Sequence, residues 1–153
     1  FNTDGLRSLL LTMSHIPNMK EKTLRYPGHA EKIQSMVDQG LFNDNNIKET
    51  VDNLFDVWKL NKNENEFTVL DINIHSDSKT IRYHLYDEFD KKTLSSSMAR
   101  TTGYTATATV NMLANNLWNK KGVHPPEIVG SSKQCIEFLL KYLNERNVSI
   151  SLL

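Results

Sequence analysis

Two segments of alternating side chains constrain the fold of this chain more than any other feature. Apolar or β-branched residues take every second position: Thr68, Leu70, Ile72 and Ile74 in Phe67–His75, and Ile81, Tyr83 and Leu85 in Thr80–Asp87. A period of two places such residues on one face of a β-strand. The polar run Ser76-Asp77-Ser78-Lys79 between the segments is typical of a turn. The pattern predicts an antiparallel hairpin.

Before the hairpin, apolar residues recur at helical spacing. Gly28 is expected to open a helix that runs to about Gln39, and Gly40 is a natural stop after it. A second helix is predicted from Asn46, as its cap, to about Leu60.

After the hairpin, the apolar stripe from Ala106 to Leu117 predicts a third helix, although the alternation of threonine and alanine from Thr105 to Thr109 also suits a strand. A capping box formed by Ser131 and Gln134 predicts a last helix, which carries Ile136, Leu139, Leu140 and Leu143. The tripeptide His124-Pro125-Pro126 predicts an extended segment, since each proline disfavours helix in the residue before it.

Two further strands are predicted, Thr23–Tyr26 and Ser95–Thr102, with a break at Gly103 after the second. Helices beside a mainly antiparallel sheet are the pattern of an α+β fold, in which helices cover the sheet. A length of 153 residues fits one domain, residues 1–153.

Composition narrows the classes of function. Lys+Arg and Asp+Glu balance at 18 each, so no overall field attracts nucleic acid or an acidic membrane, and neither is expected as a partner. No apolar run approaches the ~20 residues of a membrane helix. The single cysteine, Cys135, suits a reducing compartment, so we expect a cytoplasmic protein. A first residue Phe1 suggests a fragment of a longer chain.

The sequence contains no motif for a dinucleotide-binding site or for a metal site. The six glycines, Gly5, Gly28, Gly40, Gly103, Gly122 and Gly130, are too far apart for a dinucleotide-binding fingerprint, so no cofactor is expected on this chain alone. No metal site is expected, because the five histidines are scattered. His75 and His84 are expected to face each other loosely across the hairpin as ordinary packing neighbours.

Two arginines are candidates for binding a carboxylate. Arg25 and Arg100 are both expected at strand ends, beside threonine, glycine and tyrosine. A guanidinium fork accepts a carboxylate through two parallel hydrogen bonds. An intramolecular ion pair is the alternative for each, and the residues alone leave both open.

Four segments resemble the saccharopine dehydrogenase family, which includes the related lysine dehydrogenases: Phe1–Arg7, Lys22–His29, Met98–Thr107 and Gly122–Glu127. Their order and approximate spacing match as well. The resemblance implies a parent protein with an N-terminal Rossmann domain that binds NAD or NADP. This chain would then be the second domain of that dehydrogenase, which closes over the amino-acid substrate and supports a homodimer.

The resemblance also implies a set of site residues. Arg25 corresponds to a ligand of a substrate carboxylate, and its neighbours on the same wall are Thr23, Leu24 and Tyr26. The turn Thr3-Asp4-Gly5 corresponds to one that faces the ligand. Arg100, Thr101 and Thr102 correspond to a segment near the cleft. We expect Asp4 to stabilise a developing iminium, and His29, or a bound water, to move the amine proton.

The implied activity is an NAD(P)-dependent oxidation at the CH–NH group of an amino acid, either saccharopine or lysine. The parent protein would be the enzyme, and the isolated fragment would be inactive. The alternative is a catalytically inactive module of the same family that serves dimerisation or binding.

Overall fold

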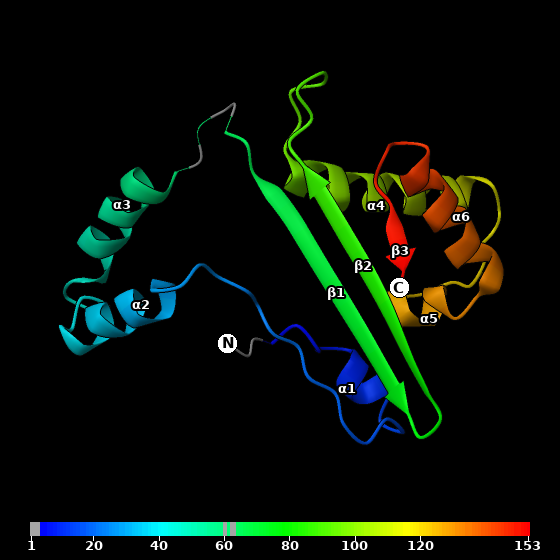
Figure 1. Cartoon of the computed structure of the whole chain (residues 1–153), viewed down its shortest axis with the longest axis horizontal. Coiled ribbons are helices and arrows are strands. Elements are labelled where there is room, and N and C mark those ends of the chain that lie inside the picture. Colours follow the sequence, from blue (N-terminus) through cyan, green and yellow to red (C-terminus); the bar gives the residue numbers. More distant parts are fainter. Residues whose placement is uncertain (1–3, 60, 62–63) are drawn as a thin grey trace. The chain divides into compact units, whose positions relative to one another are not determined.

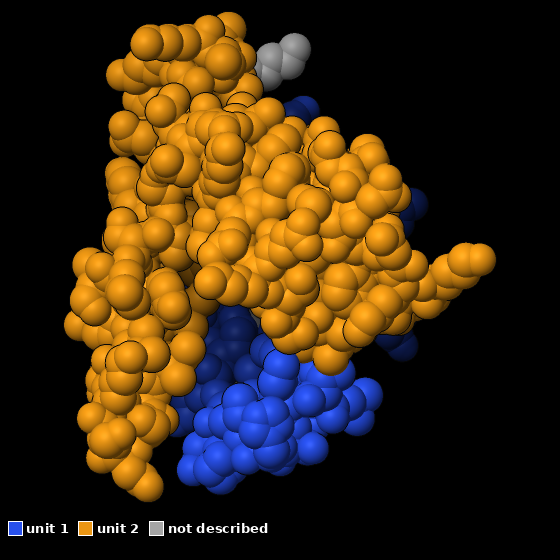
Figure 2. All heavy atoms as spheres, turned by 90° about the vertical axis from the view of Figure 1, so that its right-hand side faces the viewer, with its two compact units in different colours: residues 1–62 blue, residues 63–153 orange. Residues whose placement is uncertain are grey.

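Residues 4–59, 61 and 64–153 are described by a computed structural model of the chain (Figure 1). The chain divides into two compact units, residues 1–62 and 63–153 (Figure 2).

The first unit contains the helices α1 (Leu9–Thr12), α2 (His29–Asp38) and α3 (Ile47–Trp58). The two longer helices confirm the prediction. Gly28, just before α2, has a left-handed φ of 88°, and Gly40, just after it, has a φ of 70°, conformations that glycine adopts without strain. The buried hydroxyl of Thr50 in α3 donates to the Leu41 carbonyl at 2.7 Å, which ties α3 to the turn before it. The predicted helix end at Leu60 lies outside the described residues.

The predicted strand Thr23–Tyr26 is wrong, because these residues lie in no strand. An extended segment becomes a strand only when its backbone groups pair with a neighbour. Leu24 and Tyr26 are instead 71% and 76% exposed, so the segment lies on the surface of its unit.

The second unit carries a three-stranded antiparallel sheet in the order β1 (Phe67–Ser76), β2 (Lys79–Glu88) and β3 (Ile150–Leu152). In the hairpin Leu70 pairs with Leu85, and Ile72 pairs with Tyr83. The predicted hairpin and its shared apolar face are therefore confirmed. Strand β3 was not predicted, since three residues are too few to show a period.

One detail of the predicted hairpin is wrong. His84 lies opposite Asp71 and not opposite His75, which pairs with Thr80. The Nδ1 atom of His84 lies 2.8 Å from Oδ1 of Asp71.

The helices of the second unit are α4 (Ser97–Ala114), α5 (Pro126–Gly130) and α6 (Lys133–Asn144). The predicted strand Ser95–Thr102 and the break at Gly103 are wrong, because both fall largely within α4. The side chain of Ser96 caps this helix by accepting the Ala99 N–H at 3.1 Å. Threonine hydroxyls along α4 donate to carbonyls four residues earlier, as from Thr105 to Thr101 at 2.7 Å. These local bonds accommodate threonines that a propensity scale assigns to strands.

The last two helices depart from the prediction at their first residues. Helix α6 begins after Ser132, and the hydroxyl of Ser131 donates to the Ile128 carbonyl, so the predicted capping box is wrong. Pro125 is extended, with φ −66° and ψ 154°, as predicted, whereas Pro126 opens the short helix α5. Proline is accepted in a first helical turn because no partner is needed there for its missing N–H.

Helices α4 and α6 pack against each other, and α4 also contacts β1 and β2 (Figure 1). Between them lie the buried side chains of Leu85, Leu143 and Val148. Helices against a mainly antiparallel sheet confirm the α+β class. Within the described residues, no helix is both long and apolar enough for a membrane crossing.

Replacing Leu143 with alanine should destabilise this core. The side chain is 4% exposed, and its loss leaves a cavity that costs about 2–5 kcal/mol. Leu140→Ala on the same helix is the matched control, because Leu140 is 39% exposed and its truncation should cost about 1 kcal/mol or less. Urea unfolding followed by circular dichroism measures both, and equal losses would contradict the assigned core.

Candidate functional site

The predicted turn at Asp4-Gly5 and the predicted segment Thr23–Tyr26 meet at one side chain, Glu21. A Cβ atom added to Gly5 would lie 2.7 Å from Cδ of Glu21, closer than van der Waals contact allows. The hydroxyl of Thr23 donates to Oε1 of Glu21 at 3.5 Å. Glycine at position 5 therefore lets the turn approach the segment that carries Arg25.

Charged groups of this region lie on the surface of the first unit. Nη2 of Arg7 lies 3.1 Å from Oδ2 of Asp4, and both side chains are largely exposed. The Arg25 side chain is also exposed, and its Nη1 donates to the Leu24 carbonyl at 2.9 Å. The region therefore presents cationic groups and a carboxylate to solvent, beside the exposed ring of Tyr26.

The two predicted catalytic residues have different partners. Asp4 pairs with Arg7. His29 is the first residue of α2, and its ring lies 5.6 Å from that of Trp58 in α3. The ammonium of Lys32 lies 5.7 Å from the same Trp58 ring. Thr3, the remaining predicted residue of the turn, lies outside the described residues.

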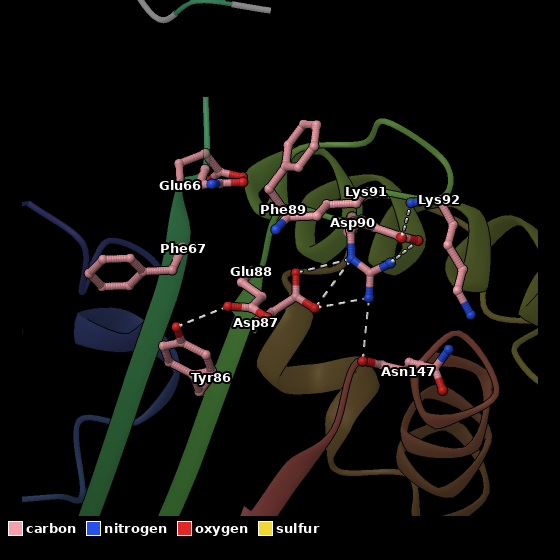
Figure 3. Close-up of a pocket in the computed structure, with 12 residues that line it drawn as sticks. Glu66, Phe67, Tyr86, Asp87, Glu88, Phe89, Asp90, Lys91, Lys92 and Asn147 are labelled. Atoms are coloured by element: carbon pink, nitrogen blue, oxygen red, sulfur yellow. Dashed lines mark hydrogen bonds and ion pairs between the residues drawn. The ribbon is translucent and has the colours of Figure 1, made fainter. Parts of the chain in front are cut away.

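Arg100 has a different environment in the second unit, where its side chain is only 7% exposed. Its Nε and Nη2 donate to the Asp87 carboxylate at 3.0–3.2 Å, and Nη1 donates to Oδ2 of Asp90 at 3.1 Å. Nη2 also donates to the carbonyls of Arg146 and Asn147, at 3.2 and 3.3 Å. Figure 3 shows Asp87, Asp90 and Asn147 around this guanidinium. For Arg100, the intramolecular ion pair is the alternative that the structure shows.

The neighbours of Arg100 also differ from the expectation. The sequence placed this arginine at a strand end, and the structure places it inside α4. The hydroxyl of Thr101 donates to the Ser97 carbonyl at 2.9 Å, and Thr102 is exposed on the same helix.

The electrostatics of this cluster favour its charged form. Hydrogen bonds to Asp87 raise the pKa of Arg100. The pKa of Asp90 lies below its ordinary value, first because the Lys92 N–H bonds to it, then because of the Thr93 hydroxyl and, to a smaller extent, the Arg100 charge. Ionised groups on both sides match the charge-assisted geometry of the cluster.

A hollow of about 780 Å³ lies beside the cluster, at the open end of the hairpin (Figure 3). Tyr86 and Phe67 stack on its wall with ring centres 5.8 Å apart, and the Tyr86 hydroxyl donates to Glu88 at 3.4 Å. Partial desolvation, and then the Glu88 charge, raise the pKa of Tyr86. In the described part of the chain, every buried side-chain nitrogen and oxygen has a hydrogen-bond partner. The hollow therefore presents no buried polar group that needs a ligand.

Sequence reasoning missed Asp87 and Glu21. Asp87 lies two residues after Leu85, on the same apolar face of β2, and a carboxylate in that register indicates a buried cationic partner. This carboxylate on an apolar strand face could have been recognised in the sequence. Nothing in the pattern singled out Glu21, whose closeness to Gly5 depends on the fold of the loop.

Replacing Arg100 with methionine should destabilise the second unit by about 3–5 kcal/mol, since Asp87 would stay buried without a counter-charge. Adding Asp87→Leu to this variant should recover much of the loss, because the buried carboxylate is then removed and the remaining partner of Arg100, Asp90, is 24% exposed and reaches water. Chemical unfolding of the single and double variants measures the coupling. Lys133→Met, in an exposed ion pair with Glu137, should cost less than about 1 kcal/mol. A double variant less stable than Arg100→Met would contradict this account.

Asp90 should give the second unit an acid-sensitive component of stability. A carboxylate whose pKa is lowered in the folded state stabilises that state when the pH is above the ordinary pKa of 3.8. This contribution is lost as the pH falls through the lower pKa of the folded state. The free energy of unfolding of the wild type should therefore exceed that of Asp90→Asn near neutral pH. The difference should shrink below pH 3.8. A pH-independent difference in urea unfolding would contradict this assignment.

A model of a known protein family matches most of this chain. The model of the saccharopine dehydrogenase C-terminal domain matches residues 2–148 of this chain. The match spans both units and includes the turn at Asp4-Gly5, the segment that carries Arg25 and the buried Arg100. The chain therefore belongs to the saccharopine dehydrogenase family, as a C-terminal domain of that family.

Proposed function

We propose that this chain is the substrate-side domain of an NAD(P)-dependent cytoplasmic oxidoreductase that acts on the CH–NH group of an amino acid, either saccharopine or lysine. The observation that carries the proposal is the exposed guanidinium of Arg25 in a chain of this family. The full-length protein is the enzyme, and the isolated chain is inactive.

Arg25 is the proposed ligand of a substrate carboxylate. The residue is exposed to solvent, and its Nη1 donates to the Leu24 carbonyl. A guanidinium carries five N–H donors, and a substrate carboxylate that exchanges with such local partners would be bound through two parallel hydrogen bonds. Thr23, Leu24 and Tyr26 form the proposed wall beside it, where a hydroxyl, an aliphatic chain and an aromatic ring meet the aliphatic part of the substrate. Each charge-assisted hydrogen bond is worth roughly 1.5–3 kcal/mol.

Arg100 is left out of the proposed ligand set, because its donors are engaged by Asp87, Asp90 and two carbonyl groups. Displacing them for a substrate would leave Asp87 buried without a partner. Thr101 and Thr102 follow Arg100 on the same helix and are left out with it.

The residues of this chain do not fit a nicotinamide dinucleotide. Pyrophosphate binding needs closely spaced glycines at the start of a helix, and the glycines here are well separated along the chain. The proposed partner that holds the cofactor is therefore an N-terminal Rossmann domain of the same protein. A second copy of the chain is the other proposed partner.

The proposed chemical contribution of this chain is positional and electrostatic. Asp4 carries a negative charge that favours a developing iminium, and its pair with Arg7 orients the carboxylate. His29 is the proposed carrier of the amine proton, directly or through a water, and its contact with Trp58 limits the rotation of its ring.

Arg25→Gln in the full-length protein should raise KM for the amino acid by roughly 10–100-fold, because two charge-assisted hydrogen bonds are lost. Arg25→Lys keeps the positive charge but lacks the two parallel donors of the guanidinium, so its KM should lie between those of the wild type and Arg25→Gln. Arg82→Gln changes an exposed arginine on β2 and should leave KM unchanged. The amide of the same amino acid lacks the carboxylate, so Arg25→Gln should not weaken its binding. If Arg25→Gln weakened the binding of the acid and of the amide equally, Arg25 would not be a ligand of the carboxylate.

A calorimetric titration separates the enzyme from the inactive dimerisation or binding module. The full-length protein is titrated with NADPH or NADH and then with L-saccharopine or L-lysine. Binding of a cofactor and an amino acid supports the enzyme. Binding of neither, by a protein that circular dichroism shows to be folded, favours the module.

A further inference from the structure

One face of the sheet carries an aspartate, a histidine and a serine side by side on three neighbouring strands. Asp71 in β1 pairs with His84 in β2, and His84 pairs on its other side with Ser151 in β3. Figure 1 shows these three strands next to one another. Directly paired residues project from the same face of a sheet, so the three side chains form one row. An acid, a base and a hydroxyl in this order are the groups that serine hydrolases use for nucleophilic catalysis.

The contact between Asp71 and His84 fixes the tautomer of the imidazole. Nδ1 of His84 lies 2.8 Å from Oδ1 of Asp71. An ionised carboxylate only accepts hydrogen bonds, so Nδ1 carries a proton and donates it to Asp71. In the neutral ring Nε2 is then the acceptor. The carboxylate therefore holds His84 in the form that a general base needs.

The hydrogen-bond pattern of the sheet places the serine beside this base. The Leu153 N–H donates to the Arg82 carbonyl at 2.9 Å, so these two residues form a bonded pair. Bonded and non-bonded pairs alternate along antiparallel strands, so His84 and Ser151 also form a bonded pair. The Cβ atoms of such neighbours lie about 4.5–5.5 Å apart. Side-chain rotation at this separation can bring Oγ of Ser151 to Nε2 of His84, a contact that commonly tightens only when substrate binds.

A backbone donor adjoins the serine hydroxyl. Leu152 pairs with Tyr83 at a non-bonded position, so its N–H points away from β2. Strand β3 is the last strand of the sheet in the part of the chain that the structure describes, so no strand of that part pairs with this outer edge. In α/β-hydrolases the N–H of the residue after the nucleophile binds the oxyanion of the tetrahedral intermediate. The Leu152 N–H has the same position relative to Ser151.

The row is accessible and borders on apolar side chains. The side chains of Asp71 and His84 are both more than one third exposed, and Ser151 is exposed. Val69 and Tyr86 form the adjacent pair on the same face, and both are exposed as well. A small apolar acyl group can lie against these two side chains while its carbonyl carbon lies at Ser151.

We propose that Ser151 is a nucleophile for acyl transfer, with His84 as its general base and Asp71 as the residue that positions His84. The substrate class is an ester with a small apolar acyl group. This activity lies outside the proposed dehydrogenase function and does not depend on it.

The reaction has two balanced steps. Oγ of Ser151 bonds to the carbonyl carbon while its proton passes to Nε2 of His84, and the Leu152 N–H binds the oxyanion. The bond from that carbon to the alcohol oxygen then breaks, and the alcohol leaves with the proton from His84. Water attacks the acyl-serine in the same way, its proton passes through His84 back to Oγ, and the acid is released.

Hydrolysis of p-nitrophenyl acetate by the full chain tests each role. Ser151→Ala and His84→Gln should each lower the rate at least about tenfold, since general-base catalysis contributes a factor of roughly 100 or more. Asp71→Asn should lower the rate as well, and Asp71→Glu should recover part of it, because only the carboxylate fixes the tautomer of His84. Mass spectrometry of the acid-quenched protein should find the acetyl group on Ser151 in the wild type and not in His84→Gln.

The chain offers matched controls for the serine and for the histidine. Ser149 is an exposed serine two residues before Ser151, and its hydroxyl donates to Oδ1 of Asn144 at 2.8 Å. His75 lies on the same face as His84, but its Nδ1 faces the Thr80 hydroxyl at 3.1 Å and no carboxylate. Ser149→Ala and His75→Gln should retain the wild-type rate, and circular dichroism checks that every variant folds.

Two results would overturn the proposal. The first is a wild-type rate no higher than that of Ser151→Ala. The second is a rate that falls in His84→Gln but is unchanged in Ser151→Ala, which would show that the imidazole acts on the ester without the serine.

Discussion

A buried arginine needs hydrogen-bond acceptors and a negative charge around its guanidinium in the folded state, because an uncompensated charge in the interior costs several kcal/mol. Arg100 meets this requirement with groups from three parts of the second unit. Asp87 belongs to β2, Asp90 to the loop after it, and the carbonyls of Arg146 and Asn147 to the turn after α6. The arginine itself lies in α4. One guanidinium thus fixes the end of the hairpin against two segments that are distant from it in sequence.

Other groups at the same junction depend on this arrangement. Ser97, three residues before Arg100, is fully buried. Its hydroxyl donates to the Asp87 carbonyl at 2.9 Å and lies 2.8 Å from the Thr68 hydroxyl, from which it can accept. Its N–H donates to the Glu66 carboxylate. The first turn of α4 is therefore bonded to β1 and β2 by side chains as well as by apolar packing. Mispairing here would leave several buried polar groups unsatisfied, which favours one arrangement over its alternatives.

The sequence predicted elements whose side chains repeat with a clear period. The hairpin has a period of two over two ten-residue strands, and its register follows from a two-residue turn. The second half of α4 was predicted from its apolar stripe, which begins at Ala106. The first half escaped the pattern because its threonines and Gly103 have low helix propensity, and capping and packing outweigh that preference. Strand β3 and helix α5 are too short to show a period.

The candidate site could be predicted only in part, for a related reason. The motif around Arg25 could be recognised in the sequence, because a guanidinium lies there beside threonine, tyrosine and glycine within a few residues. The partner of Gly5 was not visible, because a loop contact with Glu21 has no periodic signature. Arg100 looked equivalent to Arg25 along the chain, and the two differ only in burial, which depends on residues 10 and 13 positions before Arg100 and on carbonyls 46 and 47 positions after it.

The threonines of α4 have a consequence for the character of its surface. Hydroxyls at Thr101, Thr105 and Thr109 are each bonded to a carbonyl of the same helix. Because the hydroxyls are engaged, the methyl groups are the parts of these side chains that face the surroundings, next to the exposed Val110 and Leu113. The exposed surface of α4 is therefore more apolar than its many threonines suggest, and it is wetted less well by water.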